Sequence, residues 1–448
     1  MKQLTRLFIP ICLETLFYML SGMVDTLMLS AVGDYAVGAV GTANSYIGIF
    51  IIMFSIISSG MVSVMTQNIG AGRPGVAYQA RQLGLLFNAV AGVLMAVFLF
   101  SGAGAILHMV GIADALYEPA LIYLKIVGGG CVLNAVIPIF SSYLRAFGYT
   151  KQPLYATVVG NIANFVMNAV FLFVLHKGVA GVATATVISK ILNLCIVLYF
   201  SHKLISAKNS AERISNKTVL GQIVKVGLPS ACETALYNIA MMLVIRFLNQ
   251  MDAEGLNVTA RSYTATISNF SYCVGAALAQ ANAIMTGWHI GAGEFEACDR
   301  GTKRAAFVGV CVAVCMETAI VLCSGFIMPL FTDNPEMTAL VRKLLTIDIV
   351  LEVGRVTNLV FGQALKTSGD AVFPAVIAAV FMFVCAVGGT WLFGISMGLM
   401  AVGAYIGLAS DECVRAIGMV LRWRTGKWRT KKLVSQWQAG NCKNTAKT

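Results

Sequence analysis

The nine residues PICLETLFY at positions 10–18 return as PSACETALY at positions 229–237. Proline, glutamate, threonine and tyrosine recur in register, and a basic residue precedes each copy, Arg6 in the first and Lys225 in the second. Self-similarity at a fixed separation is the sequence signature of a chain built from repeats. We therefore interpret the chain as two copies of one structural unit, about 220 residues apart.

Two further pairs of motifs keep this separation. Ile69-Gly-Ala-Gly72 is matched by Ile290-Gly-Ala-Gly293, and LRAFGYTKQP at 144–153 is matched by LKTSGDAVFP at 365–374. Agreement at three places is hard to obtain from apolar composition alone. The matches predict four parts of the chain, namely an N-terminal lobe at 1–201, a linker at 202–221, a C-terminal lobe at 222–425 and a basic tail at 426–448.

The composition excludes a soluble globular protein. Hydrophobic residues make up 58% of the 448 residues and charged residues only 12%, whereas soluble domains carry about 25% charged residues. Apolar runs long enough to cross a bilayer recur about twelve times. Runs such as YIGIFIIMFSII at 46–57 do not alternate with polar residues, which favours helices over a transmembrane barrel. The twelve predicted spans are 7–31, 42–66, 83–110, 121–144, 154–175, 179–201, 222–247, 260–287, 305–330, 340–364, 371–395 and 398–421.

The sequence thus predicts an all-α polytopic membrane protein with twelve transmembrane helices in two pseudo-symmetric six-helix lobes. Because each lobe has an even number of spans, both lobes insert with the same orientation. The predicted pseudo-two-fold axis therefore runs along the membrane normal, an arrangement that in secondary transporters places the substrate site between the lobes.

The net charge of +12 reflects membrane topology rather than nucleic-acid binding. If both termini are cytoplasmic, most basic residues fall on cytoplasmic loops, as the positive-inside rule requires. We expect a cell-membrane protein with an uncleaved first span and no nucleic-acid partner. An alternative role for the basic tail is binding to anionic lipid. The basic residues left on the outer side are Lys177, Arg246, Arg261, Arg342 and Lys343.

The first predicted span carries the ionisable residues of greatest interest. Glu14, Tyr18 and Asp25 lie within about 40° of one another on a helix that turns 100° per residue. The first three spans contain no Lys or Arg away from their ends. Because carboxylates at membrane depth are costly, Asp25 and Glu14 are candidate sites for Na⁺ or H⁺.

Amide and hydroxyl side chains on the fifth and sixth spans could complete such a site. Asn161, Asn164 and Asn168 share a face of the fifth span, and Thr184 and Thr186 lie on the sixth. Their oxygens could coordinate a hard cation beside Asp25 or bind water around a protonated acid. The plain alternative is that they only hold helices together.

The second lobe repeats part of this pattern. Glu233 and Tyr237 repeat Glu14 and Tyr18, but no acid repeats Asp25. We predict that Tyr18, Asn161, Glu233 and Tyr237 contribute to substrate binding or coupling. On the tenth span we predict an ionic network of Asp348, Glu352 and Arg355. We predict hinges at Pro10 and Pro229. Lys125 and Lys190 lie near predicted helix ends, where their amines can reach the membrane interface.

These features resemble the MATE (multidrug and toxic compound extrusion) family. The resemblance rests on VDTLMLSAVGDYAVGAVG at 24–41, TQNIGAG at 66–72 followed by Arg81, LRAFG at 144–148, and GNIANFVMN with GVATATVIS at 160–189. It covers the chain to about residue 425. It implies two six-helix lobes and export of amphipathic, often cationic compounds driven by inward Na⁺ or H⁺.

The resemblance is closer to the DinF-type branch. It implies a cation site at Asp25, Asn164, Asn168 and Thr186, in which Asn168 replaces the acid of the family pattern. Glu14 on the same helix face is then a candidate for the second charge. Other branches use acids on helices 7 and 10, but Glu233 lies one turn before the helix-7 position and Arg355 occupies the helix-10 position.

The sequence leaves alternatives to exchange of a substrate for an ion (antiport). A lipid-linked oligosaccharide flippase or a metabolite exporter of the same superfamily is the main alternative, and a passive channel is another. An intramembrane enzyme needs a nucleophile–base pair or a metal cluster, yet the four histidines lie at predicted helix ends or in loops and the twelve cysteines form no C-x-x-C pair. We therefore expect a monomeric transporter of small amphipathic molecules in the lipid bilayer, with no cofactor beyond a coupling ion.

Overall fold

The computed structural model describes residues 2–110, 112–205, 212–252 and 255–434, and the regular structure in these ranges is helical throughout. The linker residues 206–211 and the tail residues 435–448 of the predicted division lie outside the described residues. The first lobe contains α1 (Lys2–Ser30), α2 (Asp34–Gly70), α3 (Pro74–Val110), α4 (Asp114–Gly129), α5 (Cys131–Ala146), α6 (Lys151–Ala169) with the π-helical turn η1 (Val170–Val174), and α7 (Gly178–Leu204).

The second lobe repeats this arrangement. Its elements are α8 (Asn216–Met251), α9 (Leu256–Ala292), α10 (Phe295–Ile327) with η3 (Met328–Leu330), α11 (Pro335–Ser368), α12 (Val372–Phe381) continued by the π-helical turns η4 (Met382–Val387) and η5 (Thr390–Ser396), α13 (Met400–Arg424), and the short η6 (Lys427–Thr430). The helices α4 and α5 form one span with a bend of 41°.

The prediction of twelve helical spans in two lobes is confirmed. Among the described residues, eight single helices, and a ninth span if the bent pair is counted, are long and apolar enough to cross a membrane. The helices α9, α11 and α13 are more polar because they bury side chains such as Asn282, Glu352 and Arg415 against one another. Mean hydropathy alone does not identify these three helices as membrane spans, since their polar groups face protein rather than lipid.

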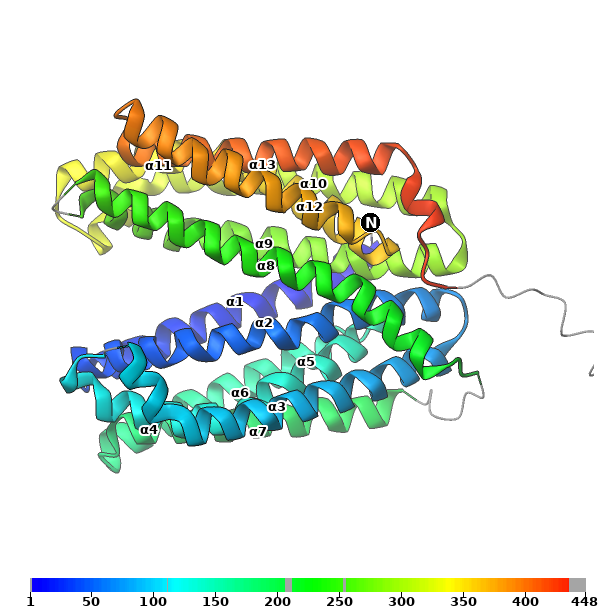
Figure 1. The fold of residues 1–448 in the computed structure, drawn as a ribbon, viewed down its shortest axis with the longest axis horizontal. Helices are drawn as coiled ribbons and strands as arrows, with labels where there is room; N and C mark the ends of the chain where they lie inside the picture. The colour runs from blue at the N-terminus through cyan, green and yellow to red at the C-terminus, as the bar shows by residue number, and fades with distance from the viewer. Residues whose placement is uncertain (1, 111, 206–211, 253–254, 435–448) are drawn as a thin grey trace, which may run out of the picture.

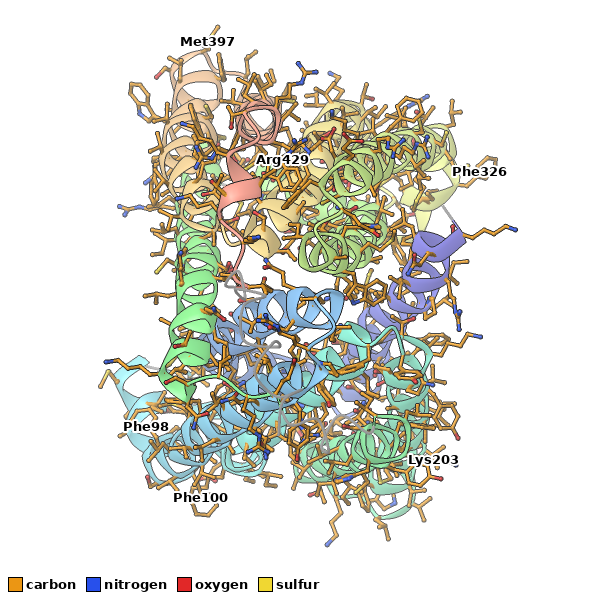
Figure 2. The ribbon with its side chains drawn as sticks, turned by 90° about the vertical axis from the view of Figure 1, so that its right-hand side faces the viewer. Phe98, Phe100, Lys203, Phe326, Met397 and Arg429 are labelled. Atoms are coloured by element: carbon orange, nitrogen blue, oxygen red, sulfur yellow. The ribbon has the colours of Figure 1, made fainter. Side chains whose placement is uncertain are left out.

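Figure 1 shows the helices running side by side in two bundles, with α1 and α2 next to the boundary between them. In the end-on view of Figure 2, Phe98, Phe100 and Lys203 mark the α1–α7 bundle, and Phe326 and Met397 mark the α8–α13 bundle. Each lobe has its own apolar core.

The lobes also exchange the beginnings of their first helices. Leu4, Leu7 and Ile11 at the start of α1 pack into a core formed by α9, α10, α11 and α13 of the other lobe. In the same way, Val219 and Ile223 at the start of α8 pack into a core formed mainly by α2, α3 and α5. This reciprocal exchange is one of the contacts that join the two lobes.

The repeated Ile-Gly-Ala-Gly motifs meet at the boundary between the lobes. A Cβ atom at Gly70 of α2 would lie 2.1 Å from the Trp288 carbonyl oxygen of α9, and one at Gly291 would lie 1.9 Å from the Gln67 carbonyl oxygen. Only glycine allows backbones to approach this closely. The two copies of the motif therefore form one symmetric contact between α2 and α9.

Hydrogen bonds also connect the two lobes at the same end of the molecule. The Gln67 amide donates to the Thr367 carbonyl (2.6 Å) and the Trp288 indole donates to the Ala146 carbonyl (2.9 Å). The Leu433 N–H donates to the Gln67 side-chain oxygen (2.8 Å). These contacts lie at the helix ends that carry the basic loops, so the lobes are joined at the end that the sequence predicts to be cytoplasmic.

The two repeated prolines do not interrupt their helices. Pro10 lies inside α1 and Pro229 inside α8, and both helices continue through them. A proline in a helix interior removes one backbone hydrogen bond. The role of these positions as hinges stays a prediction.

Candidate functional site

The two repeated glutamates form equivalent ion pairs. Glu14 of α1 accepts from the Arg145 guanidinium of α5 at 2.6 Å, and Glu233 of α8 pairs with the Lys366 amine of α11 at 2.7 Å. Both bases come from the repeated motifs LRAFG and LKTSG. Each lobe therefore builds the same acid–base pair from the same two segments.

This pairing corrects the expectation that Glu14 adds a second charge to the Asp25 site. Eleven residues of helix separate Glu14 from Asp25, which is about 16 Å along the axis at 1.5 Å per residue. Arg145 neutralises Glu14, and the Thr157 hydroxyl also donates to it (3.4 Å). The two carboxylates lie on the same helix, α1, but they belong to different clusters.

The N-lobe cluster is centred on Asp25. The Asn168 amide donates to the Asp25 carboxylate at 2.8 Å and to the Asn164 side-chain oxygen at 3.1 Å. Asn164 and Asn168 are buried, and the side-chain oxygen of Asn168 has no hydrogen-bond partner among the described residues. Asp25 itself is only partly buried and makes no ion pair within the ranges that the structure describes. The cluster therefore offers oxygens to a proton or a small cation.

Lys190 adds an amine to this cluster, contrary to the expectation that its amine reaches the membrane interface. It lies in the middle of α7 and donates to the Asn134 side-chain oxygen of α5 at 2.8 Å. It is close enough to Asp25 for the two groups to interact electrostatically. A basic group near Asp25 distinguishes this cluster from a site with two acids.

The other predicted N-lobe residues make no contact with Asp25 that is given by a hydrogen bond or ion pair among the described residues. The hydroxyls of Thr184 and Thr186 donate to carbonyl oxygens one turn earlier on their own helix, at 2.8 and 2.9 Å. The Asn161 amide donates to the Phe17 carbonyl of α1 (3.0 Å), and the Tyr18 side chain is exposed. Asn161 thus connects α6 to α1, while a role for Thr186 or Tyr18 stays a prediction.

The C-terminal lobe encloses a cavity of about 460 Å³. Tyr237 and Tyr272 line it together with Met241 and Met382. Four acidic residues (Glu233, Asp348, Asp411, Glu412) and four basic residues (Arg261, Arg355, Lys366, Arg415) also line it. Tyr405 also lines it, so that three aromatic rings, two flexible thioethers and several charges give this cavity the means to bind an amphipathic molecule.

An ionic network lies along one side of this cavity. Arg355 pairs with Glu352, as predicted, and its Nε also lies 3.7 Å from Glu412. Arg415 pairs with Asp411 at 2.6 Å and with Glu412 at 2.8 Å. The network connects α11 to α13 through the Glu412 carboxylate, which the guanidinium groups of Arg355 and Arg415 share.

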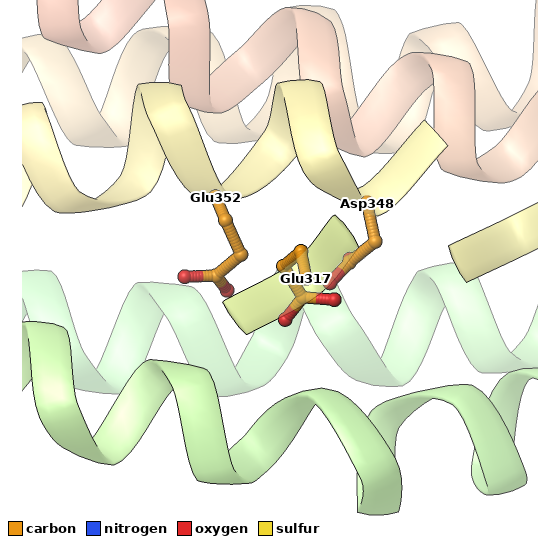
Figure 3. A group of neighbouring side chains, drawn as sticks. All are labelled: Glu317, Asp348 and Glu352. Atoms are coloured by element: carbon orange, nitrogen blue, oxygen red, sulfur yellow. The ribbon is translucent and has the colours of Figure 1, made fainter. Parts of the chain in front are cut away.

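Asp411, Glu412 and Arg415 were not among the candidate residues predicted from the sequence. All three lie inside the predicted span 398–421, so the presence of ionisable residues at membrane depth was the available signal. Glu317 of α10 was missed in the same way. Its carboxylate lies beside those of Asp348 and Glu352 of α11 (Figure 3).

Comparison with known proteins identifies the family. A family model described as MatE matches residues 10–170 and 229–405, so that its two matches begin at the repeated Pro10 and Pro229. The chain belongs to the MatE family. Members of this family are transporters, and the chain is therefore a multi-pass membrane transporter and not an enzyme. Its assignment to the DinF-type branch stays a prediction.

Individual relatives agree with this membership. The "Uncharacterized transporter YisQ" of Bacillus subtilis (strain 168) is 33% identical over 428 residues, which cover 94% of each chain. The "Probable multidrug resistance protein NorM" of Thermotoga maritima is 20% identical over 448 residues, covering 97% of this chain and 94% of the relative. A solved structure described as "Crystal structure of MATE in the straight conformation" has a TM-score of 0.85 at 22% identity and covers 96% of this chain and 97% of its own.

Proposed function

We propose that this transporter is a secondary antiporter that exports amphipathic, cationic drugs or metabolites in exchange for an inward-moving proton. The observation that carries this proposal is Asp25, an acid at membrane depth that is held by one amide and has no ion pair among the described residues. An acid of this kind can change its charge without breaking a structural contact. Glu14 and Glu233 cannot, because each one pairs with a base.

Lys190 favours H⁺ over Na⁺ as the coupling ion. When Asp25 and Lys190 are both charged, their charges cancel, so an additional Na⁺ would leave an excess positive charge at membrane depth. Loss of one proton from the pair leaves a net charge of −1, and regaining that proton restores neutrality. The resident ammonium group therefore takes the place of an external metal ion beside Asp25.

The C-lobe cavity supports a cationic, amphipathic substrate. Four acids and four bases line it, so that a cation can pair with a carboxylate while the bases keep the cavity as a whole close to neutral. A cation is also attracted to the faces of Tyr237 and Tyr272. The name of the Thermotoga maritima relative, a probable multidrug resistance protein, is consistent with such a substrate.

Coupling requires only that proton and substrate prefer different states of the two lobes. In the described state the lobes are joined at the predicted cytoplasmic end, which suits release on the opposite side. We place the transporter in the cell membrane with both termini cytoplasmic, as the distribution of basic residues predicts.

The test is export of a cationic dye from proteoliposomes under a pH gradient alone and under a Na⁺ gradient alone. We expect the pH gradient to drive export and Asp25→Asn to abolish it. Asp114→Asn, an equivalent change at the exposed start of α4, is the control and should transport normally. Undiminished export by Asp25→Asn would refute the role of Asp25, and export driven only by Na⁺ would refute the role of Lys190. Dye-independent transport of a lipid-linked sugar would favour the flippase alternative.

A further inference from the structure

Three buried carboxylates from two helices of the C-terminal lobe converge on one point. Glu317 comes from α10, and Asp348 and Glu352 lie one turn apart on α11 (Figure 3). One oxygen of each carboxylate lies within 4.8 Å of the others. Their exposed fractions are 0%, 2% and 0%, so water does not solvate them from outside.

Most of the oxygens in this group have no hydrogen-bond partner within the described part of the chain. Both carboxylate oxygens of Glu317 lack one, as do Oδ2 of Asp348 and Oε2 of Glu352. The buried hydroxyls of Ser268 and Ser271 on α9 interact with Asp348 and Glu317 respectively. Four carboxylate oxygens without a partner therefore lie in one buried group, beside two hydroxyls. Buried polar atoms normally have partners.

The charges of the group are also unbalanced. Arg355 pairs with Glu352 and is shared with Glu412, so at most one of the three negative charges is neutralised. Two buried carboxylates without counterions are too costly to keep ionised in an apolar lobe. An additional charge of +2 would balance the group.

We infer that Glu317, Asp348 and Glu352 form a binding site for a hard, oxygen-preferring divalent metal cation. Ca²⁺ accepts six to eight oxygens, carboxylate oxygens among them, in a flexible geometry. Mg²⁺ demands near-octahedral geometry and usually keeps several waters, so a site built from protein oxygens suits Ca²⁺ better. Asp348 also lines the C-lobe cavity, which gives an ion a route to the site.

This site is separate from the proposed coupling at Asp25. It lies in the other lobe, and its distinguishing residue, Glu317, is on the ninth span. A bound ion would connect α10 to α11 and would remove negative charge next to the cavity. Occupancy of the site would therefore weaken binding of a cationic substrate, independently of proton coupling.

The experiment measures equilibrium binding of radiolabelled Ca²⁺ to the purified full chain in detergent, with Mg²⁺ and Na⁺ as competitors. We expect saturable binding of one ion, weaker competition by Mg²⁺ and Na⁺, and a loss of affinity of at least about tenfold in Glu317→Gln. Glu296→Gln makes the same chemical change at an exposed position of the same helix and should bind normally. Ser271→Ala removes one neutral oxygen and should weaken binding even if Glu317→Gln does not fold.

Absence of saturable binding of every metal tested, at pH values from about 6 to 8, would overturn the inference and would mean that protons alone neutralise the three acids. Binding that Glu317→Gln and Ser271→Ala leave unchanged would overturn it as well. The failure of this inference is distinguishable from failure of the proposed antiport. Asp25→Asn should bind Ca²⁺ normally, whereas Glu317→Gln should retain export driven by a pH gradient.

Discussion

The contact between the two glycine motifs predicts that Gly291→Ala opens the lobes at their joined end. The added Cβ atom would lie 1.9 Å from the Gln67 carbonyl oxygen and 2.9 Å from the Ala71 nitrogen. Ordinary contacts of a Cβ atom begin at 3.4 Å, so α2 and α9 must separate by the difference of 1.5 Å. Neither atom belongs to a flexible side chain that could move aside.

The expected cost follows from this overlap. Overpacking of a well-packed contact costs about 1–3 kcal/mol. Because about 1.4 kcal/mol corresponds to a factor of ten, the joined state should lose about 5-fold to 150-fold in population relative to the open state. The alanine itself adds no backbone strain, since Gly291 lies inside the regular helix α9.

Hydrogen–deuterium exchange of the purified protein measures this change directly. Backbone amides near Gln67 at the end of α2 and near Trp288 at the end of α9 should exchange faster by the same factor. Gly48→Ala is the matched control, because Gly48 lies in α2, the helix that Gly291 of α9 contacts, and has nothing within 4 Å of its added Cβ. Equal exchange in the two variants would refute the conclusion that the glycine contact holds the lobes together.

Two further predictions concern stability. Glu14→Gln leaves the Arg145 guanidinium without its counterion and should lower the free energy of unfolding by about 1–3 kcal/mol, measured by thermal shift. The double variant with Arg145→Gln should recover part of this loss. Additive losses of the two single variants would show that the pair is not coupled. Asp252 follows α8 and its carboxylate accepts from two backbone N–H groups at the start of α9, at 2.9 and 3.0 Å. Partial burial raises the pKa of Asp252, but these hydrogen bonds and that of the Asn257 amide outweigh it and leave the pKa below its usual value. A depressed pKa contributes stability above the unfolded-state value and loses it as the pH falls through the folded-state value. The stability difference between the wild type and Asp252→Asn should therefore be constant from pH 5 to 7 and shrink below about pH 4; a difference that grows on acidification would contradict this role.

The sequence by itself determined the architecture and the equivalence of the two lobes. Hydropathy is a local property, because each residue that faces lipid must be apolar whatever its neighbours are. The twelve spans could therefore be located one at a time. Repetition of Glu14 as Glu233 was likewise visible in the linear order, and so was the ion pair of Glu352 with Arg355, since residues three apart on a helix are neighbours.

Only the tertiary structure decided which groups from different helices meet. Arg145 is 131 residues from Glu14, and their contact depends on the rotation and the depth of both helices in the lobe. The same is true of Lys190 beside Asp25, Gly291 against Gln67, and Glu317 beside Asp348. A single span shows which face is polar but not which helix that face will meet, because the packing of all twelve spans sets the rotation of each one.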